Sequence, residues 1–209
     1  MMNKKLLMAI CAVYFSVLTW AADISQAQKE LQLIVDAAEA AVAQNQWRDA
    51  KKRWDLALQK VAAVAGDDEY LAVLYYEQGR SAGVLCQWDE AEISLQKALT
   101  LDKKTDGPFF MSLLELARLQ LAQKNLQQAK EFYDQLLPEL KANEAAVIDP
   151  IGSAEIVSEY AQVLVKLGAV EAAKPYREMA DTWRNKHQGI EAETSKTPYG
   201  SLCQFIEGK

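Results

Sequence analysis

The amino-acid sequence predicts an all-α protein, and its composition and an internal repeat are the observations that support this class. Of 209 residues, 32 are alanine, the strongest helix former, whereas glycine (9) and proline (5) are scarce. An all-β domain would need more of both residues for its tight turns. The repeat reads as paired amphipathic helices. We therefore expect an α-solenoid of antiparallel helix pairs.

The chain opens with a segment that is typical of a secretory signal peptide. Two lysines precede a mostly apolar run over residues 6–18, and Thr19 and Ala21 place small residues before a cleavage point. The apolar run is shorter than the roughly 20 residues of a comfortable membrane span. We expect a signal peptide over residues 1–21 and an exported protein, periplasmic or secreted. The alternatives are a retained membrane anchor, a lipoprotein and a helix within the fold.

Three segments of the remaining chain align with one another as an internal repeat. They begin at Asn45, Cys86 and Lys124 and read NQWRDAKKRWDLALQKV, CQWDEAEISLQKALTLD and KNLQQAKEFYDQLLPEL. Each copy has a turn residue, a bulky apolar residue two positions later, an alanine and then an amphipathic helix. A looser fourth copy begins at Leu167. One helical hairpin cannot bury its apolar stripe alone, so stacked copies would share a continuous core.

The repeat resembles the tetratricopeptide repeat (TPR), a helix–turn–helix unit of 34 residues. The second copy matches the family pattern most fully, with Gly79, Ala82, Trp88, Ala91 and Ala98 at the small and aromatic positions. The resemblance implies a TPR-like superhelix of about four units. We therefore expect a signal peptide, then a TPR-like domain over residues 22–187 and a C-terminal tail over residues 188–209.

The repeat departs from the family pattern in its length. The repeat alanines Ala50, Ala91, Ala129 and Ala173 lie 41, 38 and 44 residues apart instead of 34. The additional residues fall between units, in linkers that contain Asp, Gly and Pro and therefore suit helix ends and turns. Pro175 lies inside the last expected helix. Because proline interrupts helix hydrogen bonding, we expect that helix to start late or to bend.

The sequence offers little for catalysis. No glycine-rich loop is followed by the Lys and Ser or Thr of a phosphate cradle, and the single histidine, His187, has no nucleophile placed beside it. A metal site would need more histidine and cysteine ligands. The net charge of −6 argues against nucleic acid as a partner. We expect a non-enzymatic protein with no cofactor and no metal, which binds a protein or peptide and is not inserted in a membrane after signal cleavage.

The resemblance also implies a concave groove, formed by the first helix of each unit, that binds extended peptides. The residues expected to line it are Tyr76, Arg80, Leu114 and Arg118. The two arginines occupy matching positions in adjacent units, and a guanidinium binds carboxylates through two parallel hydrogen bonds. Such a groove suits a peptide with an acidic group or a free C-terminus. The alternative is that the arginines pair with nearby acids such as Glu77 or Glu115.

Only two cysteines would remain after export, Cys86 and Cys203. Cys86 lies at the expected turn between two helices, and Cys203 lies in a tail long enough to fold back. An even count in an oxidising compartment favours pairing, so we expect a Cys86–Cys203 disulfide that ties the tail to the array. The alternative is two free thiols.

Together these observations favour an interaction scaffold of a bacterial-type envelope that binds its partner in the groove. Two other readings stay open. One is a thiol-active protein that uses Cys86 or Cys203, and the other is a structural array that associates with itself into an oligomer.

Overall fold

The computed structural model describes residues 26–61, 64 and 67–203, and within these residues the regular secondary structure is entirely helical. A first helix covers residues 26–43. It is followed by α2 (Trp47–Val61), α3 (Asp68–Val84), α4 (Trp88–Lys104), α5 (Phe109–Ala122), α6 (Leu126–Ala142), α7 (Ala145–Ile148), α8 (Pro150–Lys166) and α9 (Val170–Lys186). The expected signal peptide lies outside the described residues.

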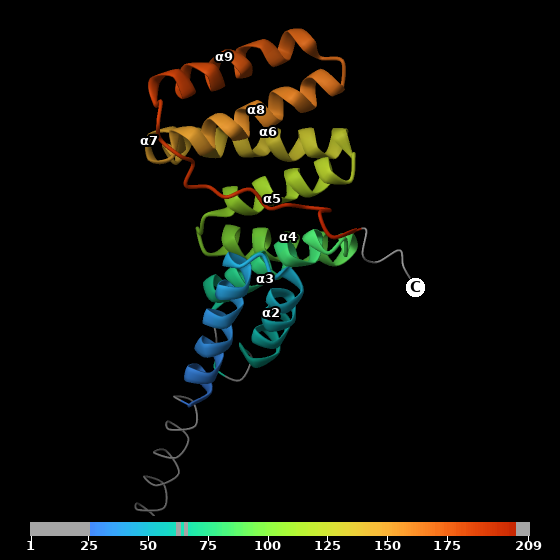
Figure 1. The fold of residues 1–209 in the computed structure, drawn as a ribbon, viewed down its shortest axis with the longest axis vertical. Helices are drawn as coiled ribbons and strands as arrows, with labels where there is room; N and C mark the ends of the chain where they lie inside the picture. The colour runs from blue at the N-terminus through green and yellow to red at the C-terminus, as the bar shows by residue number, and fades with distance from the viewer. Residues whose placement is uncertain (1–25, 62–63, 65–66, 204–209) are drawn as a thin grey trace, which may run out of the picture.

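The helices form antiparallel pairs that stack into an α-solenoid, as the sequence predicts (Figure 1). The pairs are the first helix with α2, α3 with α4, α5 with α6, and α8 with α9. Contacts pass from each helix to the next along the stack, from α2 through α6 and then to α8 and α9. The short helix α7 occupies the long linker between the third and fourth pairs.

None of the helices within residues 26–61 and 67–203 combines the length and the apolar character that crossing a membrane requires.

The core is built from the residues that define the repeat. The repeat alanines Ala50, Ala91, Ala129 and Ala173 have no exposed surface, so neighbouring helices approach closely there. Four residues after the first three of these alanines come Trp54, Leu95 and Tyr133, which are at most 1% exposed. These large side chains fill the space beside the small ones, which is the dense packing that protein interiors show.

The turn inside each pair has the same backbone geometry in all four units. Asn45, Cys86, Lys124 and Gly168 have positive φ angles of 57°, 63°, 67° and 81°. After each of them, a backbone N–H donates to a carbonyl five residues earlier, as Gln87 does to Ala82 at 3.0 Å. This is the Schellman pattern, which satisfies the last carbonyls of the preceding helix.

Two aspartates begin first helices of the units. Asp67 accepts a hydrogen bond from the Tyr70 N–H at 2.9 Å and caps α3. Asp149 accepts one from the Gly152 N–H at 2.8 Å and caps α8. An N-cap carboxylate of this kind satisfies a backbone donor that the helix leaves free.

Pro175 does not make the last helix start late, so that half of the expectation is wrong, whereas the bend stays a prediction. Helix α9 begins at Val170, five residues before this proline. Pro175 is exposed, and so is Glu171, whose carbonyl loses its helical donor. Water can bond that carbonyl, which explains why the helix tolerates the proline. Pro138 in α6 is likewise exposed.

The tail returns along the stack after α9. In Figure 1 it runs as an irregular red segment from α9 past α7 and α5 to the turn between α3 and α4. We call residues 193–203 of this tail the strap. The strap crosses the surface formed by α3, α5 and α8, which we call the first-helix face because each of these helices is the first of its unit.

Candidate functional site

The first-helix face carries a line of alternating acidic and basic side chains. Glu77 and Arg80 on α3 are joined at 2.8 Å, and Glu115 and Arg118 on α5 at 3.3 Å. The line continues from Arg118 to Glu159 on α8, at 2.9 Å, and Arg80 lies 3.9 Å from Glu115. The three glutamates occupy the same position in successive units, so the helical repeat itself places them in line.

This charge ladder is buried. Glu115 is 1% exposed, Arg118 3% and Glu159 6%. Burial alone would raise the pKa of Glu159, but Arg118 and Lys196 hold the pKa of that carboxyl below its usual range. Burial would lower the pKa of Arg118, and the carboxylates of Glu159 and Glu115 raise it instead. Both residues are therefore charged at neutral pH.

Glu77, at the end of the ladder, differs from the other members. Burial raises the pKa of its carboxyl, although Arg80 opposes that shift. One of its oxygens, Oε2, is buried and has no hydrogen-bond partner in the described structure. The ladder is thus less well satisfied at its α3 end than at its α8 end.

The strap supplies a matching group to four members of the ladder, Arg80, Glu115, Arg118 and Glu159. Lys196 Nζ lies 2.7 Å from Glu159, and the Tyr199 hydroxyl donates to Glu115 at 2.8 Å. Arg80 Nε donates to the Thr197 hydroxyl at 2.8 Å. Arg118 lies 3.5 Å from the Ser195 carbonyl oxygen. The Thr194 N–H donates to the capping carboxylate Asp149 at 2.8 Å.

The end of the strap is fixed to α3 by backbone contacts. Gly200 N–H and Leu202 N–H donate to the carbonyls of Gly83 and Val84, both at 3.3 Å. The absence of a side chain at Gly83 makes room for Tyr199, because a Cβ there would lie 2.5 Å from the Cδ1 atom of the tyrosine ring. Only glycine at position 83 lets the strap approach α3 this closely.

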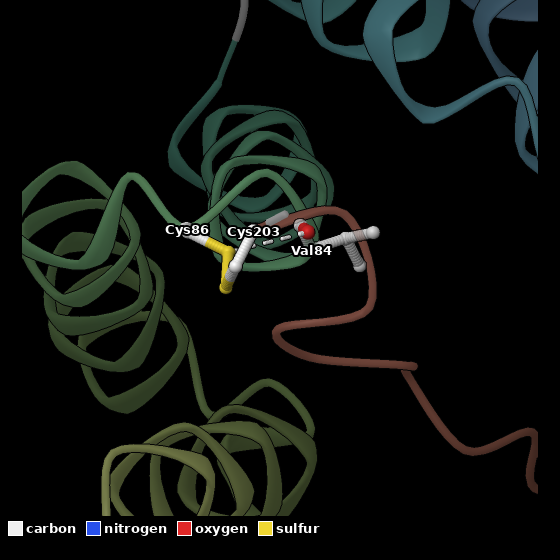
Figure 2. Close-up of a disulfide and its surroundings, with 3 residues drawn as sticks. All are labelled: Val84, Cys86 and Cys203. Carbon is white, nitrogen blue, oxygen red and sulfur yellow. Dashed lines mark hydrogen bonds between the residues drawn. A yellow bond between two sulfur atoms is a disulfide. The ribbon is translucent and has the colours of Figure 1, made fainter. Parts of the chain in front are cut away.

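A disulfide joins Cys86 to Cys203, as the sequence predicts (Figure 2). The Cα atoms are 5.4 Å apart, and Cys86 Sγ lies 3.9 Å from the Val84 carbonyl oxygen. Both cysteines are half-buried and reach the surface. Neither cysteine carries a free thiol in this state, so the thiol-active reading has no thiol to act with here.

The residues predicted to line a groove have different environments in the structure. Arg80 and Arg118 pair with Glu77, Glu115 and Glu159, which agrees with the alternative of neighbouring acids. Leu114 is fully buried in the core and offers no surface to a partner in this state. Tyr76 is half-buried, and its ring lies 5.5 Å from the Arg80 guanidinium. The strap covers much of the predicted groove.

Part of the first-helix face stays open beside the strap. A cavity of about 400 Å³ lies where the strap begins, between α3, α5, α7 and α8. Its lining includes Tyr76, Arg80, Met111, Ile156 and Thr194. A larger, mostly apolar cavity of about 770 Å³ lies between α6, α7, α8 and α9, with Leu137, Val157, Met179 and Trp183 in its lining.

Sequence reasoning missed Glu159, Asp149 and the contacts of the strap. A signal for Glu159 was present, because Glu stands at the same repeat position in the second, third and fourth units. No comparable signal marks Asp149 as a contact of the tail.

His187 follows α9 at the start of the tail. Within residues 26–61, 64 and 67–203 there is no group of histidine, cysteine and acidic residues that could hold a metal ion.

Several solved structures superpose on most of this chain. Neither a protein-family model nor a curated protein matches the sequence. Among solved structures, BtubC (BKLC) from P. vanneervenii superposes with a TM-score of 0.70 at 15% identity, over 79% of this chain and 67% of that one. TPR-like repeats of a putative kinesin light chain from Podosopora anserina give 0.63 at 20%, over 83% and 80%.

A third similar structure is the Rap conjugation gene regulator of the plasmid pLS20 in complex with the Phr* peptide. It gives a TM-score of 0.54 at 15% identity, over 75% of this chain and 54% of that one. At these identities the likeness concerns the fold. The helix pairs, the repeated core positions and the superpositions agree that this chain has the fold of a TPR-like α-solenoid.

Proposed function

We propose that this protein is an exported, non-enzymatic scaffold that binds a protein or peptide partner along its first-helix face. One observation carries the proposal: this face already holds an extended segment of polypeptide. The strap lies across α3, α5 and α8 and is bound through charged side chains of three successive units. A surface that holds its own chain in this way has the shape and the polar groups for an extended partner.

The open cavity beside the strap supports contact with a partner while the strap is in place. It joins an aromatic ring, Tyr76, and apolar side chains such as Met111 to the charged Arg80. Interfaces commonly combine aromatic and arginine side chains in this manner. A TPR-like neighbour, the Rap regulator, was solved in complex with a peptide, which fits this class of function.

The charge ladder favours a structural role over catalysis. Its carboxylates and guanidiniums pair with one another across α3, α5 and α8, which ties these helices together. The ladder also positions the strap, because Glu115, Glu159 and Arg80 each bind a strap side chain.

The N-terminal sequence and the disulfide support the proposal of export. A basic start, a short apolar run and Ala21 form the pattern of a cleaved signal peptide. Disulfides persist in the periplasm and outside the cell, whereas the cytosol keeps thiols reduced. We therefore propose the envelope or the exterior as the working compartment of this protein.

The test of the binding surface is capture of partners by the purified mature protein from an envelope extract. Tyr76→Ala removes the aromatic wall of the open cavity, and we expect it to reduce capture at least about tenfold, the effect of losing an aromatic anchor. Ile93→Ala on α4 is the matched control, since Ile93 is 56% exposed on another surface. Circular dichroism checks that both variants are folded. Equal capture by both variants would place the partner elsewhere.

A further inference from the structure

Three side chains of the strap, close together in sequence, each bind a different residue of the ladder. A cation at residue 196 binds a carboxylate, a hydroxyl at 197 binds a guanidinium, and a phenol at 199 binds a second carboxylate. The ladder partners are Glu159, Arg80 and Glu115, one from each of α8, α3 and α5. Thr197 is 2% exposed, so the pattern is seated in the array and does not merely lie on it.

The helices are held to one another by contacts that do not involve the strap. Helix-to-helix contacts are continuous from α2 to α9, and the turns inside the pairs are closed by their own backbone hydrogen bonds. The pairs Glu77–Arg80, Glu115–Arg118 and Arg118–Glu159 lie within the helices and do not involve the tail. Removal of the strap would therefore uncover a preformed surface.

The uncovered surface would hold groups that lack partners. One oxygen of Glu159 would lose Lys196, and one oxygen of Glu115 would lose the Tyr199 hydroxyl. The Arg80 Nε–H would lose Thr197. The balance of charge would also change, since three glutamates would face two arginines. Once uncovered, these groups would be hydrated, and an extended segment would bind by replacing that water with charged and hydroxyl groups in the same geometry.

The disulfide controls whether the strap can leave. With Cys86 bonded to Cys203, both ends of the strap are attached to the array, one through α9 and one through the turn after α3. Once that bond is open, only the α9 end is tethered, and the strap competes at the millimolar effective concentration of a short flexible linker. Both cysteines are only partly buried, which gives a small dithiol a side from which to reach the bond.

We propose that the strap stands in for the partner, so that the first-helix face recognises an extended segment with a basic residue, a hydroxyl residue directly after it and a tyrosine two residues further on. A dithiol that opens the Cys86–Cys203 bond lets such a segment replace the strap. This inference rests on the proposed function and adds the chemistry of the partner to it.

The exchange balances with a dithiol reductant as its co-reactant. A thiolate of the dithiol attacks one sulfur of the protein disulfide, forms a mixed disulfide and releases the other cysteine as a thiolate, which takes up a proton. The second thiol of the reductant then displaces the remaining protein cysteine. Two electrons pass to the protein, which gains two thiols, and the reductant ends as a disulfide.

The experiment uses the full mature chain and a fluorescent peptide with the sequence of residues 193–202, ETSKTPYGSL. Fluorescence anisotropy measures peptide binding with and without dithiothreitol. We expect the reduced chain to bind at least about tenfold more tightly than the oxidised chain, because the strap is then held only by its tether. A scrambled peptide should not bind, and a peptide with Glu at the place of Lys196 should bind at least about tenfold more weakly.

Two variants separate the disulfide from other effects of reduction. Cys203→Ser should bind the peptide without reductant, and dithiothreitol should not change its affinity. In the reduced chain, Lys196→Ala weakens the strap and should raise the affinity for the peptide. Glu191→Ala, an exposed change in the same tail, should leave that affinity unchanged.

The inference is overturned if Cys203→Ser and the reduced chain bind the peptide no better than the oxidised chain while circular dichroism shows the array folded. Equal binding of the scrambled peptide would also overturn it. The proposed function is tested separately. If the oxidised and reduced chains capture the same envelope partner equally well, the function stands and this inference fails. If the peptide binds as expected but no envelope partner is captured, the strap exchange is supported and the proposed function fails.

Discussion

At the scale of single residues, the turn inside each unit shows how one backbone requirement selects different side chains. The position after each first helix is left-handed, with asparagine, cysteine, lysine and glycine in the four units. Glycine adopts this conformation without steric cost, and asparagine tolerates it, whereas lysine does so at a cost. In unit two the residue at this position is Cys86, which forms the disulfide with the tail.

Lys124→Gly should therefore stabilise the protein. Lys124 is exposed and has a φ of 67°, so the substitution relieves strain without removing a buried contact. We expect a gain of about 0.5–1 kcal/mol in the free energy of unfolding, measured by urea denaturation. The reverse change, Gly168→Ala, is the matched control. A Cβ at Gly168 would have no atom within 4 Å, so its loss of about 1 kcal/mol would come from the backbone alone.

Tyr199→Phe tests the hydrogen bond between the strap and the ladder. The change keeps the aromatic ring beside Gly83 and removes the hydroxyl that donates to the buried Glu115 carboxylate. We expect a loss of about 1.5–3 kcal/mol in the free energy of unfolding of the oxidised chain, the usual range for a hydrogen bond to a charged group. Tyr75→Phe, where the ring packs near the Lys97 ammonium, should cost much less. Equal effects would assign no special role to Glu115.

At the scale of elements, the charge ladder ties α3, α5 and α8 together. Arg118 is its central member, because its guanidinium contacts both Glu115 on its own helix and Glu159 on the next first helix. A buried pair of this kind adds little net stability over an apolar core, but removing one partner leaves a buried charge. The relative positions of α3, α5 and α8 therefore depend on every residue of the ladder.

Arg118→Ala should cost about 3–5 kcal/mol in the free energy of unfolding, since two buried carboxylates lose their shared cation. Arg53→Ala is the control, because Arg53 pairs with Asp49 at 2.8 Å on an exposed surface and should cost less than about 0.5 kcal/mol. Thermal and urea denaturation of both variants give the comparison. A small effect at Arg118 would show that water or another cation replaces the guanidinium.

The cap of α8 is sensitive to acid. Burial alone would raise the pKa of Asp149, but hydrogen bonds from Thr194 and Gly152 hold it below its usual range. A carboxyl whose pKa is lowered by folding stabilises the protein above its unfolded pKa, about 3.9, and loses that effect as the pH falls through the folded pKa. Folding also lowers the pKa of Glu159, so its contribution to stability is likewise lost in acid, starting from an unfolded pKa of about 4.3.

Asp149→Asn isolates this contribution, because asparagine still caps a helix but carries no charge. We expect the wild type to be more stable than the variant by about 1 kcal/mol near pH 6, the difference between a charged and a neutral hydrogen-bond acceptor. The gap should close as the pH falls below about 4. Urea denaturation from pH 3 to pH 7 measures both curves, and parallel curves would contradict the assignment.

At the scale of the whole molecule, the strap changes how the solenoid is connected. Each unit of a solenoid contacts only its neighbours, so stability is normally local. Here the chain after the fourth unit returns to the second, and the disulfide joins residues 117 positions apart. The strap therefore links units two, three and four into one closed loop.

The intact mass of the exported protein tests this closure and the cleavage together. After alkylation in denaturant without reductant, we expect one monomeric mass that begins at Ala22 and carries no alkyl group. Two alkyl groups would show free thiols, and a doubled mass would show a bond between two chains. Opening the disulfide should lower the free energy of unfolding by at most about 4–5 kcal/mol, the loop-entropy limit for a loop of this length.

The regular part of the fold could be predicted because its determinants are local and repeated. The positions of Trp88, Ala91 and Leu95 are filled by similar residues at the same spacing in other units. Each copy therefore supports the repeat found in the others. The late start expected from Pro175 was wrong because the cost of a proline depends on whether the freed carbonyl meets water. That exposure is decided by packing and is not visible in the local pattern.

Arg80 and Arg118 contact the strap on the first-helix face, but the environment of the predicted groove residues could not be read from the sequence. The repeat put Arg80 and Arg118 at matching positions, and it contained the glutamates that neutralise them. Leu114 was expected to line the groove and lies in the core instead. Whether a residue near the boundary between face and core is exposed or buried depends on how the neighbouring helices cross it.

The sequence by itself determined the helix pairs, their turns, the small and large core positions and the two cysteines available for pairing. These depend on interactions over a few residues or on an exact repeat. Only the tertiary structure decided that residues 193–203 cover the first-helix face and bind Arg80, Glu115 and Glu159. Those contacts join residues 37 to 117 positions apart and have no period in the sequence. Their partners are chosen by three-dimensional proximity and by the need to satisfy buried charge.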